Sequence, residues 1–283
     1  MSKKKVWFIT GTSSGFGRAL AEEVLAKGDR VVATARKPEV LRDLIEKYPD
    51  TARAVKLDVT NLEDVKNSIQ EAVREFGRID VLVNNAGYGL VGAIEEASSE
   101  QIKHQFDTNV FGVLNVTREV LPILRGQKSG HIVNIGSLVG FAAFPSLGYY
   151  SATKFALEGL SEALAAEVAP HGIKTTIVEP GPFYTGFSSR ALIVGENLLP
   201  EVYPSTTELT GAFPQFDGPT AGDPVKAVRI IIEAVESENP PFRLPLGLFA
   251  FEGIEAKLEQ VKQEISVWRE RATQTNFDAA ATA

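Results

Sequence analysis

A phenol and an ammonium group lie four residues apart in the sequence, at Tyr150 and Lys154 of the segment YYSATK. On a helix this spacing places both side chains on one face, one turn apart. An isolated tyrosine has a pKa of about 10, but a neighbouring ammonium favours the phenolate and lowers that pKa. The pair could therefore act as a general acid and base. The same spacing occurs by chance in many helices, so a solvated surface pair is the alternative.

A glycine-rich segment, TGTSSGFG (10–17), follows the apolar run VWFIT (6–10) and opens a helix-like stretch that ends near Gly28. Glycines allow a tight turn and a close approach of the backbone to a pyrophosphate, and a helix start offers free N–H groups and a positive dipole end. A position at the first turn from strand to helix predicts a dinucleotide-phosphate site. A glycine-rich turn that only helps the helix to pack is the alternative.

The end of the second expected strand, TARK, indicates which dinucleotide fits. NAD sites usually present an acidic side chain there, which repels a 2′-phosphate, whereas an arginine can hold that phosphate with two hydrogen bonds. We therefore expect NADP(H), with Arg36 on the 2′-phosphate, Thr34 as a helper and Lys37 as a weaker second charge. A surface ion pair of Arg36 with Glu39 or Asp43 is the alternative.

Apolar strand-like runs alternate with amphipathic helix-like stretches along the chain, which predicts an α/β fold with a doubly wound parallel sheet, the Rossmann fold. The expected strands are 6–10, 31–35, 52–57, 79–84, 131–136 and 173–178, and the expected helices are 15–27, 61–76, 99–124 and 150–168. Neither a repeat nor a linker interrupts this pattern, so a single domain over residues 1–283 is expected.

The organisation changes after Pro180. Residues 181–224 combine Gly, Pro, Ser and Thr with many aromatic residues, and a long apolar loop of this kind predicts a substrate-binding lid. A helix over 223–237 and a strand over 242–246 are expected next. A C-terminal extension, 247–283, should contain a helix over about 251–271 and a tail, FDAAATA, that frays.

Composition excludes several classes of protein. The chain has 283 residues, 44% hydrophobic and 23% charged, with a net charge of −7 and no cysteine. The acidic balance argues against nucleic acid as a partner, and the absence of cysteine excludes disulfides and thiolate chemistry. No apolar run is long enough to span a bilayer, and the stretch after MSKKK is too short for a signal peptide, so no membrane partner and a cytoplasmic location are expected.

Further motifs, in order and spacing, make the chain resemble the short-chain dehydrogenase/reductase family in its single-domain branch, over roughly residues 5–185. The matching residues are Thr10, Gly11, Gly15 and Gly17; Asp58 and Val59; Asn84, Asn85, Ala86 and Gly87; Asn109; Ser137; Tyr150 and Lys154; and Pro180, Gly181 and Thr185. The gap from Ser137 and the gap to Lys154 select Tyr150 rather than Tyr149 as the family's tyrosine.

The resemblance implies an oxidoreductase in which Tyr150 exchanges a proton with a carbonyl or alcohol oxygen. Lys154 would tune Tyr150 and bind the nicotinamide ribose, Ser137 would hold the oxygen, and Asn109 would anchor a water. It also implies the following NADP(H)-binding residues: Gly11, Thr12, Ser13, Ser14, Gly15, Phe16, Gly17, Thr34, Arg36, Asp58, Val59, Asn85, Ala86, Gly87, Tyr150, Lys154, Pro180, Gly181, Phe183 and Thr185. Ser14, where many NADP-preferring members have a base, and Phe183, where a small β-branched residue is usual, depart from the family pattern.

Aromatic and aliphatic residues beside the motifs predict an apolar pocket with one polar end. The expected substrate-binding residues are Phe141, Phe144, Leu147, Tyr184 and Phe187. A lipophilic or aryl ketone, aldehyde or secondary alcohol would fit such a pocket, and the chain looks most like the 17β-hydroxysteroid and retinol dehydrogenase-like members. Aromatic core beneath the lid is the alternative.

Other interpretations stay open. An NADP(H)-binding sensor, or an epimerase or dehydratase that keeps its nicotinamide, could use the same motifs. The three histidines have no ligand spacing, so no metal is expected, and Glu95 and Glu96 are expected in a solvated turn. The family resemblance implies a homodimer or homotetramer formed by the helices over 99–124 and 150–168, and the C-terminal helix could block or remake one interface.

Overall fold

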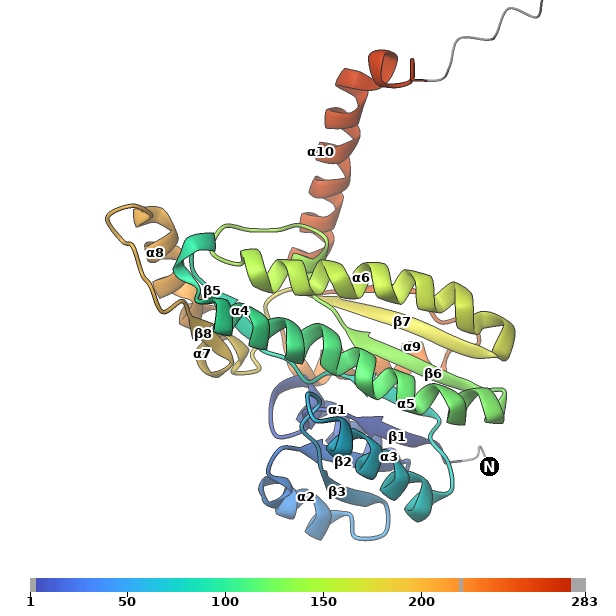
Figure 1. The fold of residues 1–283 in the computed structure, drawn as a ribbon. Helices are drawn as coiled ribbons and strands as arrows, with labels where there is room; N and C mark the ends of the chain where they lie inside the picture. Colours follow the sequence, from blue (N-terminus) through green and yellow to red (C-terminus); the bar gives the residue numbers. More distant parts are fainter. Residues whose placement is uncertain (1–3, 219–220, 276–283) are drawn as a thin grey trace, which may run out of the picture.

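Seven parallel strands form the central sheet of the computed structural model, which describes residues 4–218 and 221–275 (Figure 1). The strand order is β3-β2-β1-β4-β6-β7-β9. The strands are β1 (Val6–Ile9), β2 (Arg30–Ala35), β3 (Ala52–Lys56), β4 (Val81–Asn84), β6 (Gly130–Ile135), β7 (Ile173–Pro180) and β9 (Arg243–Leu246). The doubly wound sheet of a single domain is thereby confirmed.

Helices cover both faces of this sheet. The main ones are α1 (Gly15–Ala26), α2 (Arg42–Lys47), α3 (Leu62–Phe76), α4 (Ser99–Phe106), α5 (Gly112–Gln127), α6 (Gly148–Val168) and α9 (Pro224–Glu236). On β1, Trp7 packs in one core layer with α1, α2 and α9, and Phe8 packs in the other with α3, α5 and α6. Successive strand residues point to opposite faces, so two apolar layers require the nearly unbroken apolar runs seen in the sequence.

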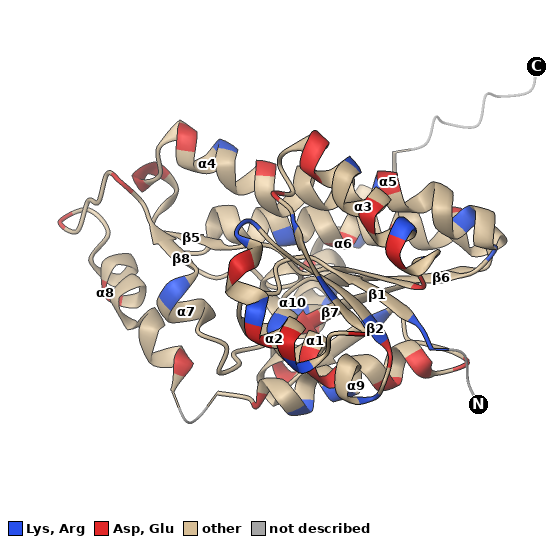
Figure 2. Ribbon diagram, turned by 90° about the horizontal axis from the view of Figure 1, so that it is seen from below, with Lys and Arg blue, Asp and Glu red and all other residues tan. Residues whose placement is uncertain are grey.

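Charged residues lie on the outer surfaces of these helices, with both signs interspersed (Figure 2). Arg18 of α1 forms ion pairs with Glu22 on its own helix and with Asp43 on α2. Arg229 of α9 contacts Glu23 of α1 at 2.6 Å. These pairs link the helices of one face. Among the described helices, none combines the length and the apolar composition that crossing a membrane requires.

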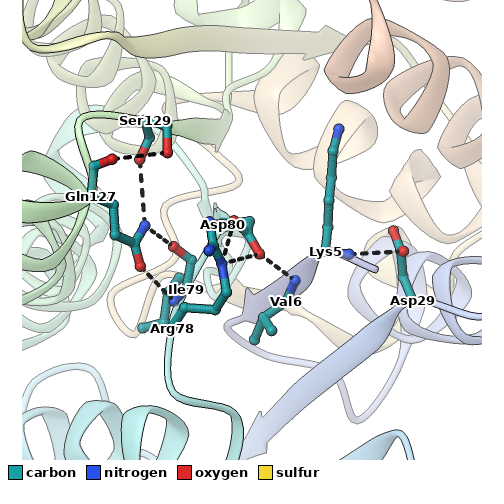
Figure 3. Close-up of polar contacts among 8 residues, drawn as sticks. All are labelled: Lys5, Val6, Asp29, Arg78, Ile79, Asp80, Gln127 and Ser129. Atoms are coloured by element: carbon teal, nitrogen blue, oxygen red, sulfur yellow. Dashed lines mark hydrogen bonds and ion pairs between the residues drawn. The ribbon is translucent and has the colours of Figure 1, made fainter. Parts of the chain in front are cut away.

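Hydrogen bonds close the amino-terminal edge of the sheet (Figure 3). The N–H of Val6, the first residue of β1, donates to Oδ2 of Asp80 at 2.9 Å. The N–H of Lys5 donates to Oδ1 of Asp29 at 3.0 Å. The side-chain amide of Gln127, at the end of α5, bonds both backbone groups of the residue before Asp80. Polar groups at this edge are thus occupied by the fold itself.

The segment after β7 contains more regular secondary structure than the sequence predicted. It contains α7 (Phe187–Arg190), β8 (Leu192–Val194) and α8 (Pro204–Ala212). β8 pairs in parallel with β5 (Gly89–Val91), forming a second, two-stranded sheet. The helix expected over 99–124 is divided by a π-helical segment, and α10 (Leu248–Ala272) begins three residues earlier than expected. The predicted fraying of the last residues concerns a segment outside the described residues.

Candidate active site

A cavity of about 670 Å³ opens at the carboxyl edge of the sheet. Its lining comes from the glycine loop after β1, from the ends of β2, β3, β4 and β6, from the first turns of α6, and from the segment after β7. Carboxyl ends of parallel strands meet at one edge, which is where open α/β sheets bind their ligands. Motifs scattered over 170 positions of the sequence therefore come together in one site.

The glycine loop is shaped by close backbone contacts. Gly11 has a φ of +70°, which few other residues adopt. A Cβ on Gly17 would lie 2.4 Å from both the Gly11 carbonyl oxygen and Nδ2 of Asn85. That Nδ2 donates to the carbonyl oxygens of Thr10 and Gly11, each at 2.9 Å. The loop is thus held against the end of β4, with Gly11, Ser13, Ser14, Gly15 and Phe16 facing the cavity.

Two residues of the predicted cofactor set serve the loop rather than the cavity. The Thr12 hydroxyl is buried and donates to the Thr34 carbonyl oxygen at 3.1 Å. Gly17 is buried at the start of α1 and lies outside the cavity lining. Their contribution to a bound phosphate is indirect, because they set the path of the backbone around it.

The residues predicted to determine the preference for NADP(H) over NAD(H) lie on the part of the cavity formed by the ends of β2 and β3. Arg36 and Asp58 both line it. Burial acts to raise the pKa of the Asp58 carboxyl, but hydrogen bonds from Thr60 and, to a smaller extent, the Arg36 charge bring it below its usual value. Within residues 4–218 and 221–275, no carboxylate lies at ion-pair distance from Arg36, and Asp43 is engaged by Arg18. The surface pairing considered as an alternative for Arg36 is therefore not formed.

The prediction that Thr34 helps to hold the phosphate is wrong. Thr34 is fully buried, and its hydroxyl donates to the carbonyl oxygen of Ile9 at 3.0 Å. Thr34 still pairs with Val55 of β3, and β2 continues to Ala35, so the side chain lies within the sheet and not beyond its edge. Val59, Asn85, Ala86 and Gly87, in contrast, line the cavity as expected.

Ser137, Tyr150 and Lys154 come together in the middle of the cavity. Nζ of Lys154 lies 5.6 Å from the centroid of the Tyr150 ring and donates to the Ile135 carbonyl oxygen at 2.7 Å. Tyr150 and Lys154 are both buried, on the first two turns of α6. Tyr150 and Lys154 therefore form an internal pair, and the alternative of a solvated surface pair is wrong.

Burial controls the charge of this pair. It raises the pKa of the Tyr150 phenol well above its usual value, which the neighbouring Ser137 hydroxyl offsets only in part. The expected lowering by Lys154 is thus outweighed, because a phenolate loses its hydration in this apolar enclosure. Burial also lowers the pKa of the Lys154 ammonium to about 8, against the opposing effect of Glu158. At neutral pH the pair holds a neutral phenol beside a cation.

Asn109 is buried in the π-helical segment Asp107–Phe111, between α4 and α5. Its Nδ2 donates to the carbonyl oxygen of Tyr88 at 2.8 Å and to the Thr153 hydroxyl at 3.2 Å. Its Oδ1 accepts from the Tyr88 N–H at 3.1 Å. A π turn often marks a functional position because it displaces one side chain from the helical register. Here the turn ties Asn109 to the neighbours of Gly87 and Lys154.

The side of the cavity beyond Tyr150 is apolar. Phe144, Leu147 and Phe187 line it, and the Phe187 ring lies 5.6 Å from that of Tyr150. Leu209 and Phe213 of the segment after β7 complete the wall. The alternative, in which these aromatic residues are only core beneath the lid, does not hold for the cavity-lining ones.

Two predicted substrate residues do not reach the cavity. Tyr184 is 64% exposed and lies outside the lining, since its side chain faces solvent while its N–H donates to the Gly222 carbonyl oxygen. Phe141 packs under the Arg243 guanidinium, 5.6 Å from the ring centroid, and is also absent from the lining. These two assignments are wrong because side-chain direction in loops does not follow from sequence spacing.

Phe183, which departs from the family pattern, lines the cavity. Its ring contacts that of Phe16 edge to face at 5.2 Å. A Cβ on Gly222 would lie 2.4 Å from the ring, so a glycine there makes room for the phenylalanine. Pro180, Gly181 and Thr185 line the same side of the cavity.

Several residues that line the cavity were not predicted from the sequence. Tyr88 and His104 line its rim and form a hydrogen bond of 2.7 Å, and Phe249 of α10 stacks on Phe144 with ring centroids 6.5 Å apart. A histidine or phenylalanine at an amphipathic helix position carries no signal that separates rim from surface. No group of three or more His, Cys, Asp or Glu side chains among the described residues is placed to hold a metal ion.

Of Glu95 and Glu96, which were expected in a solvated turn, Glu95 is exposed but Glu96 is not. Glu96 is buried, and its Oε1 accepts from the Leu199 N–H at 2.7 Å while Oε2 accepts from the Ala93 N–H at 2.6 Å. Oε1 of Glu95 accepts from the Tyr203 hydroxyl at 2.6 Å. The two carboxylates fasten the segment after β7 over the apolar side of the cavity.

The cavity fits a nicotinamide dinucleotide. A loop in which Gly11 and Gly17 leave no room for a Cβ atom, placed at the start of α1, suits a pyrophosphate. Arg36, after β2, provides a cation for the adenosine side, and Lys154, on α6, provides a hydrogen-bond donor for the nicotinamide side. The positions of these two side chains thus match the two ends of a nicotinamide dinucleotide.

Comparisons with known proteins agree with this geometry. The family model for short chain dehydrogenases matches residues 5–192. Oxidoreductase BOA17 of Botryotinia fuckeliana is 40% identical over 271 residues, which are 94% of this chain and 97% of that protein. The 3-ketodihydrosphingosine reductase of Bacteroides thetaiotaomicron is 40% identical over 246 residues, 86% of this chain and 88% of that protein.

Solved structures show the same fold. A short-chain dehydrogenase from Streptomyces avermitilis has a TM-score of 0.91 at 44% identity, with 97% of this chain and 100% of that chain covered. A relative from Burkholderia phymatum in complex with NAD has a TM-score of 0.79 at 26% identity, with 93% and 95% covered. One from Burkholderia cenocepacia in complex with NADP has a TM-score of 0.70 at 26% identity, with 98% and 99% covered. The chain is a member of the short-chain dehydrogenase/reductase family, an oxidoreductase that acts on CH–OH groups with a nicotinamide cofactor.

Proposed function

We propose that this protein is an NADP(H)-dependent oxidoreductase that interconverts a lipophilic ketone or aldehyde and its alcohol, with Tyr150 as the proton donor and acceptor. One observation carries the proposal. The Tyr150 phenol lies where two differently built halves of one cavity meet: a glycine loop and cation on one side, and an apolar wall on the other.

The direction of proton transfer follows from the charges of the pair. A phenol whose pKa is raised by burial stays protonated at neutral pH, so Tyr150 is ready to donate to a carbonyl oxygen during reduction. The cation of Lys154 stabilises the phenolate left behind, because charges attract strongly in a dry site. Ser137 beside the phenol positions the substrate oxygen by a hydrogen bond. The nicotinamide supplies the hydride when bound, and the chain supplies placement and proton transfer.

The preference for NADP(H) is supported by Arg36. Its guanidinium lines the adenosine end of the cavity without a carboxylate partner among the described residues, which suits a 2′-phosphate. Asp58 lies at the same end but is engaged with Thr60, whose hydroxyl donates to its Oδ1 at 2.7 Å. Family members carry either cofactor, so this choice is a property of the residues at the end of β2.

The apolar wall supports a substrate with a long or aromatic apolar body next to its carbonyl. Phe144, Leu147 and Phe187 offer no charge to such a molecule. Arg190 also lines the cavity, but its guanidinium donates to the Thr185 carbonyl oxygen at 3.2 Å. The Bacteroides relative is named as a reductase of a keto compound, 3-ketodihydrosphingosine. The wall favours that class over small or charged carbonyl compounds.

The decisive test is the pair of variants Tyr150→Phe and Tyr149→Phe. Loss of the Tyr150 hydroxyl should lower kcat for NADPH-dependent ketone reduction by about 10²–10⁴-fold, with NADPH affinity in a fluorescence titration close to wild type. Tyr149 is the matched control, because its hydroxyl only donates to the Ile94 carbonyl oxygen at 2.8 Å. Undiminished turnover in Tyr150→Phe would remove the acid/base assignment. A set of apolar and polar carbonyl compounds, assayed with the wild-type enzyme, tests the substrate class.

A further inference from the structure

Helix α10 extends away from the rest of the molecule (Figure 1). Its base is attached: Ala250 is fully buried, and Ile254 packs on Leu138 and Ala142. Beyond that base, residues 255–272 would reach about 27 Å at the rise of an α-helix. Only Ala250 of its 25 residues is buried. Helices gain most of their stability from packing of one face, so a long helix without such packing calls for a partner.

Apolar residues on α10 follow one regular spacing. They recur at alternating steps of three and four residues and form what we term the α10 stripe: Phe251, Ile254, Leu258, Val261, Ile265 and Trp268. Leu258, Ile265 and Trp268 are 54%, 62% and 61% exposed, respectively. Val267 is the one large apolar residue of this part of the helix outside the stripe. Alternating steps of three and four are the pattern of a helix that packs along a second helix in a coiled coil.

Charged residues flank the stripe on both sides. On one side lie Glu255 and Lys262, and on the other lie Lys257 and Glu264; Arg269 and Arg271 continue the two sides toward the end of the helix. Such flanking positions set the partner and orientation of a coiled coil, because each faces a flanking position of the other helix. The order of signs is opposite on the two sides, so a reversed copy of the same helix presents the complementary charge at each position.

We propose that α10 pairs with α10 of a second copy of this chain in an antiparallel coiled coil centred between Leu258 and Val261. Reversal about that centre sets Leu258 opposite Val261, Ile254 opposite Ile265, and Phe251 opposite Trp268 of the other copy. All six positions of the stripe are then covered by apolar residues.

Charges select this arrangement over the others. In the antiparallel register, Glu255 faces Lys262 and Lys257 faces Glu264 of the other copy, which gives four attractive pairs by symmetry. Sliding the helices by one heptad in one direction sets Glu255 against Glu255 and Lys257 against Lys257. Sliding them in the other direction sets Lys262 against Lys262 and Glu264 against Glu264. Repulsion therefore opposes both neighbouring registers.

A parallel pair is also disfavoured. In that arrangement Lys257 would face Lys262 of the other copy, while Glu264 would face Arg269, so two repulsive pairs offset two attractive ones beside the stripe. Only the antiparallel pair with the stated centre combines full apolar coverage with charges that are all complementary. A C2 dimer is the symmetry that such a self-complementary helix generates.

Pairing would also reach the cavity. Trp268 of the second copy would lie beside Phe251, two residues from Phe249, whose ring lines the cavity and stacks on Phe144. The second copy thus braces the base of α10 and with it one part of the cavity wall. This interface is separate from the faces of α4, α5 and α6 through which the family resemblance predicted assembly.

The test is the mass of the full chain in solution, measured by light scattering behind size exclusion. Wild type should form assemblies of an even number of copies. Two double variants each give these four flanking positions the same charge: Glu255→Lys with Glu264→Lys, and Lys257→Glu with Lys262→Glu. Each double variant should halve that mass. An equimolar mixture of the two variants should restore it. The control, Glu252→Lys with Glu270→Lys, makes the same charge change away from the stripe and should keep the wild-type mass.

Orientation is tested with cysteines, because the chain has none. A mixture of Phe251→Cys and Trp268→Cys chains should form disulfide-linked pairs under mild oxidation. Trp268→Cys alone should not, since in the antiparallel pair its two copies lie about 25 Å apart along the helices. A monomeric wild type, or a wild-type mass kept by both charge variants, would overturn the proposal, as would crosslinking of Trp268→Cys alone. Far-ultraviolet circular dichroism checks that each variant is folded.

Discussion

At the amino ends of the strands polar side chains are paired with backbone groups, whereas at the carboxyl ends they line an open cavity. Asp80 and Asp29 each hold a backbone N–H at the amino edge. At the carboxyl edge Arg36 has no carboxylate partner among the described residues, and Tyr150 and Lys154 are buried with pKa values shifted by burial. Polar side chains at the amino edge stabilise the fold, whereas those at the carboxyl edge are available to a ligand.

The comparison predicts that substitutions at the carboxyl edge change ligand binding, and that those at the amino edge change stability alone. Gly17→Ala should have the largest effect. Its Cβ would meet the Gly11 carbonyl oxygen and Nδ2 of Asn85 at 2.4 Å, so the loop must shift, with a loss of about 3 kcal/mol in the free energy of unfolding. NADPH affinity should fall as well, because the displaced loop no longer fits the pyrophosphate.

Urea unfolding and a cofactor titration measure the two losses. Gly126→Ala on α5 is the matched control, because its Cβ would meet nothing within 4 Å. It should gain about 0.5–1 kcal/mol from reduced chain entropy. If Gly17→Ala kept wild-type affinity for NADPH, the loop would not be the phosphate site.

The second prediction concerns pH and the amino edge. His131, near the start of β6, is buried, and desolvation, with the nearby Lys174 and Lys5 charges, lowers its pKa to about 4 from 6.5. The folded state therefore resists protonation. The stability from the neutral ring is complete above pH 6.5 and is lost as the pH falls toward 4, by up to about 3 kcal/mol.

His131→Gln should remove most of that loss, as measured by thermal unfolding at a series of pH values from 4 to 7. The amide can still hydrogen-bond the Thr176 hydroxyl, which lies 2.9 Å from Nε2 in wild type. His171→Gln, at an exposed position, is the control and should retain the wild-type pH dependence. An equal acid loss in His131→Gln would show that other groups cause it.

The sheet was predictable because its strands are buried on both faces and therefore apolar throughout, and most of the site was predictable because the motifs end those strands. The paired strands β5 and β8 were missed, since three residues carry no periodicity and their partners lie about a hundred positions apart. Helix α2 was also missed. Thr34 was misassigned because β2 continues past it to Ala35, and the sequence does not mark the residue at which the sheet ends.

Tertiary contacts account for the remaining differences. The sequence predicts a surface position for Glu96. Its burial is possible because the N–H of Leu199, distant in sequence, donates a hydrogen bond to its carboxylate. Desolvation raises the pKa of the Tyr150 phenol, where a lowering by Lys154 was expected, and the ring is buried in part against Phe187 and Phe213 of the segment after β7. Neither follows from the spacing of residues along the chain.

The third prediction returns to the carboxyl edge. Arg36→Asp should weaken NADPH binding about 10- to 100-fold, since hydrogen bonds between charged groups contribute about 1.5–3 kcal/mol. NADH, without a 2′-phosphate, should lose far less. Arg42→Asp makes the same charge change outside the cavity lining and should leave both affinities unchanged. Equal losses for NADPH and NADH in isothermal titrations of Arg36→Asp would contradict the phosphate contact.

The last and smallest effect should come from Asp80 at the amino edge. Asp80→Asn keeps the size of the side chain but weakens its bonds to the Val6 N–H and to the Arg78 guanidinium. A charged acceptor in a partly buried position contributes more than a neutral one, so a loss of about 1–2 kcal/mol in the free energy of unfolding is expected. KM values for cofactor and ketone should stay at wild type, because the side chain lies at the opposite end of the strands. Asp50→Asn, at an exposed turn, is the control for loss of one charge. A change in KM without a change in stability would mean that the amino edge also shapes the site, and the division between the two edges would fail.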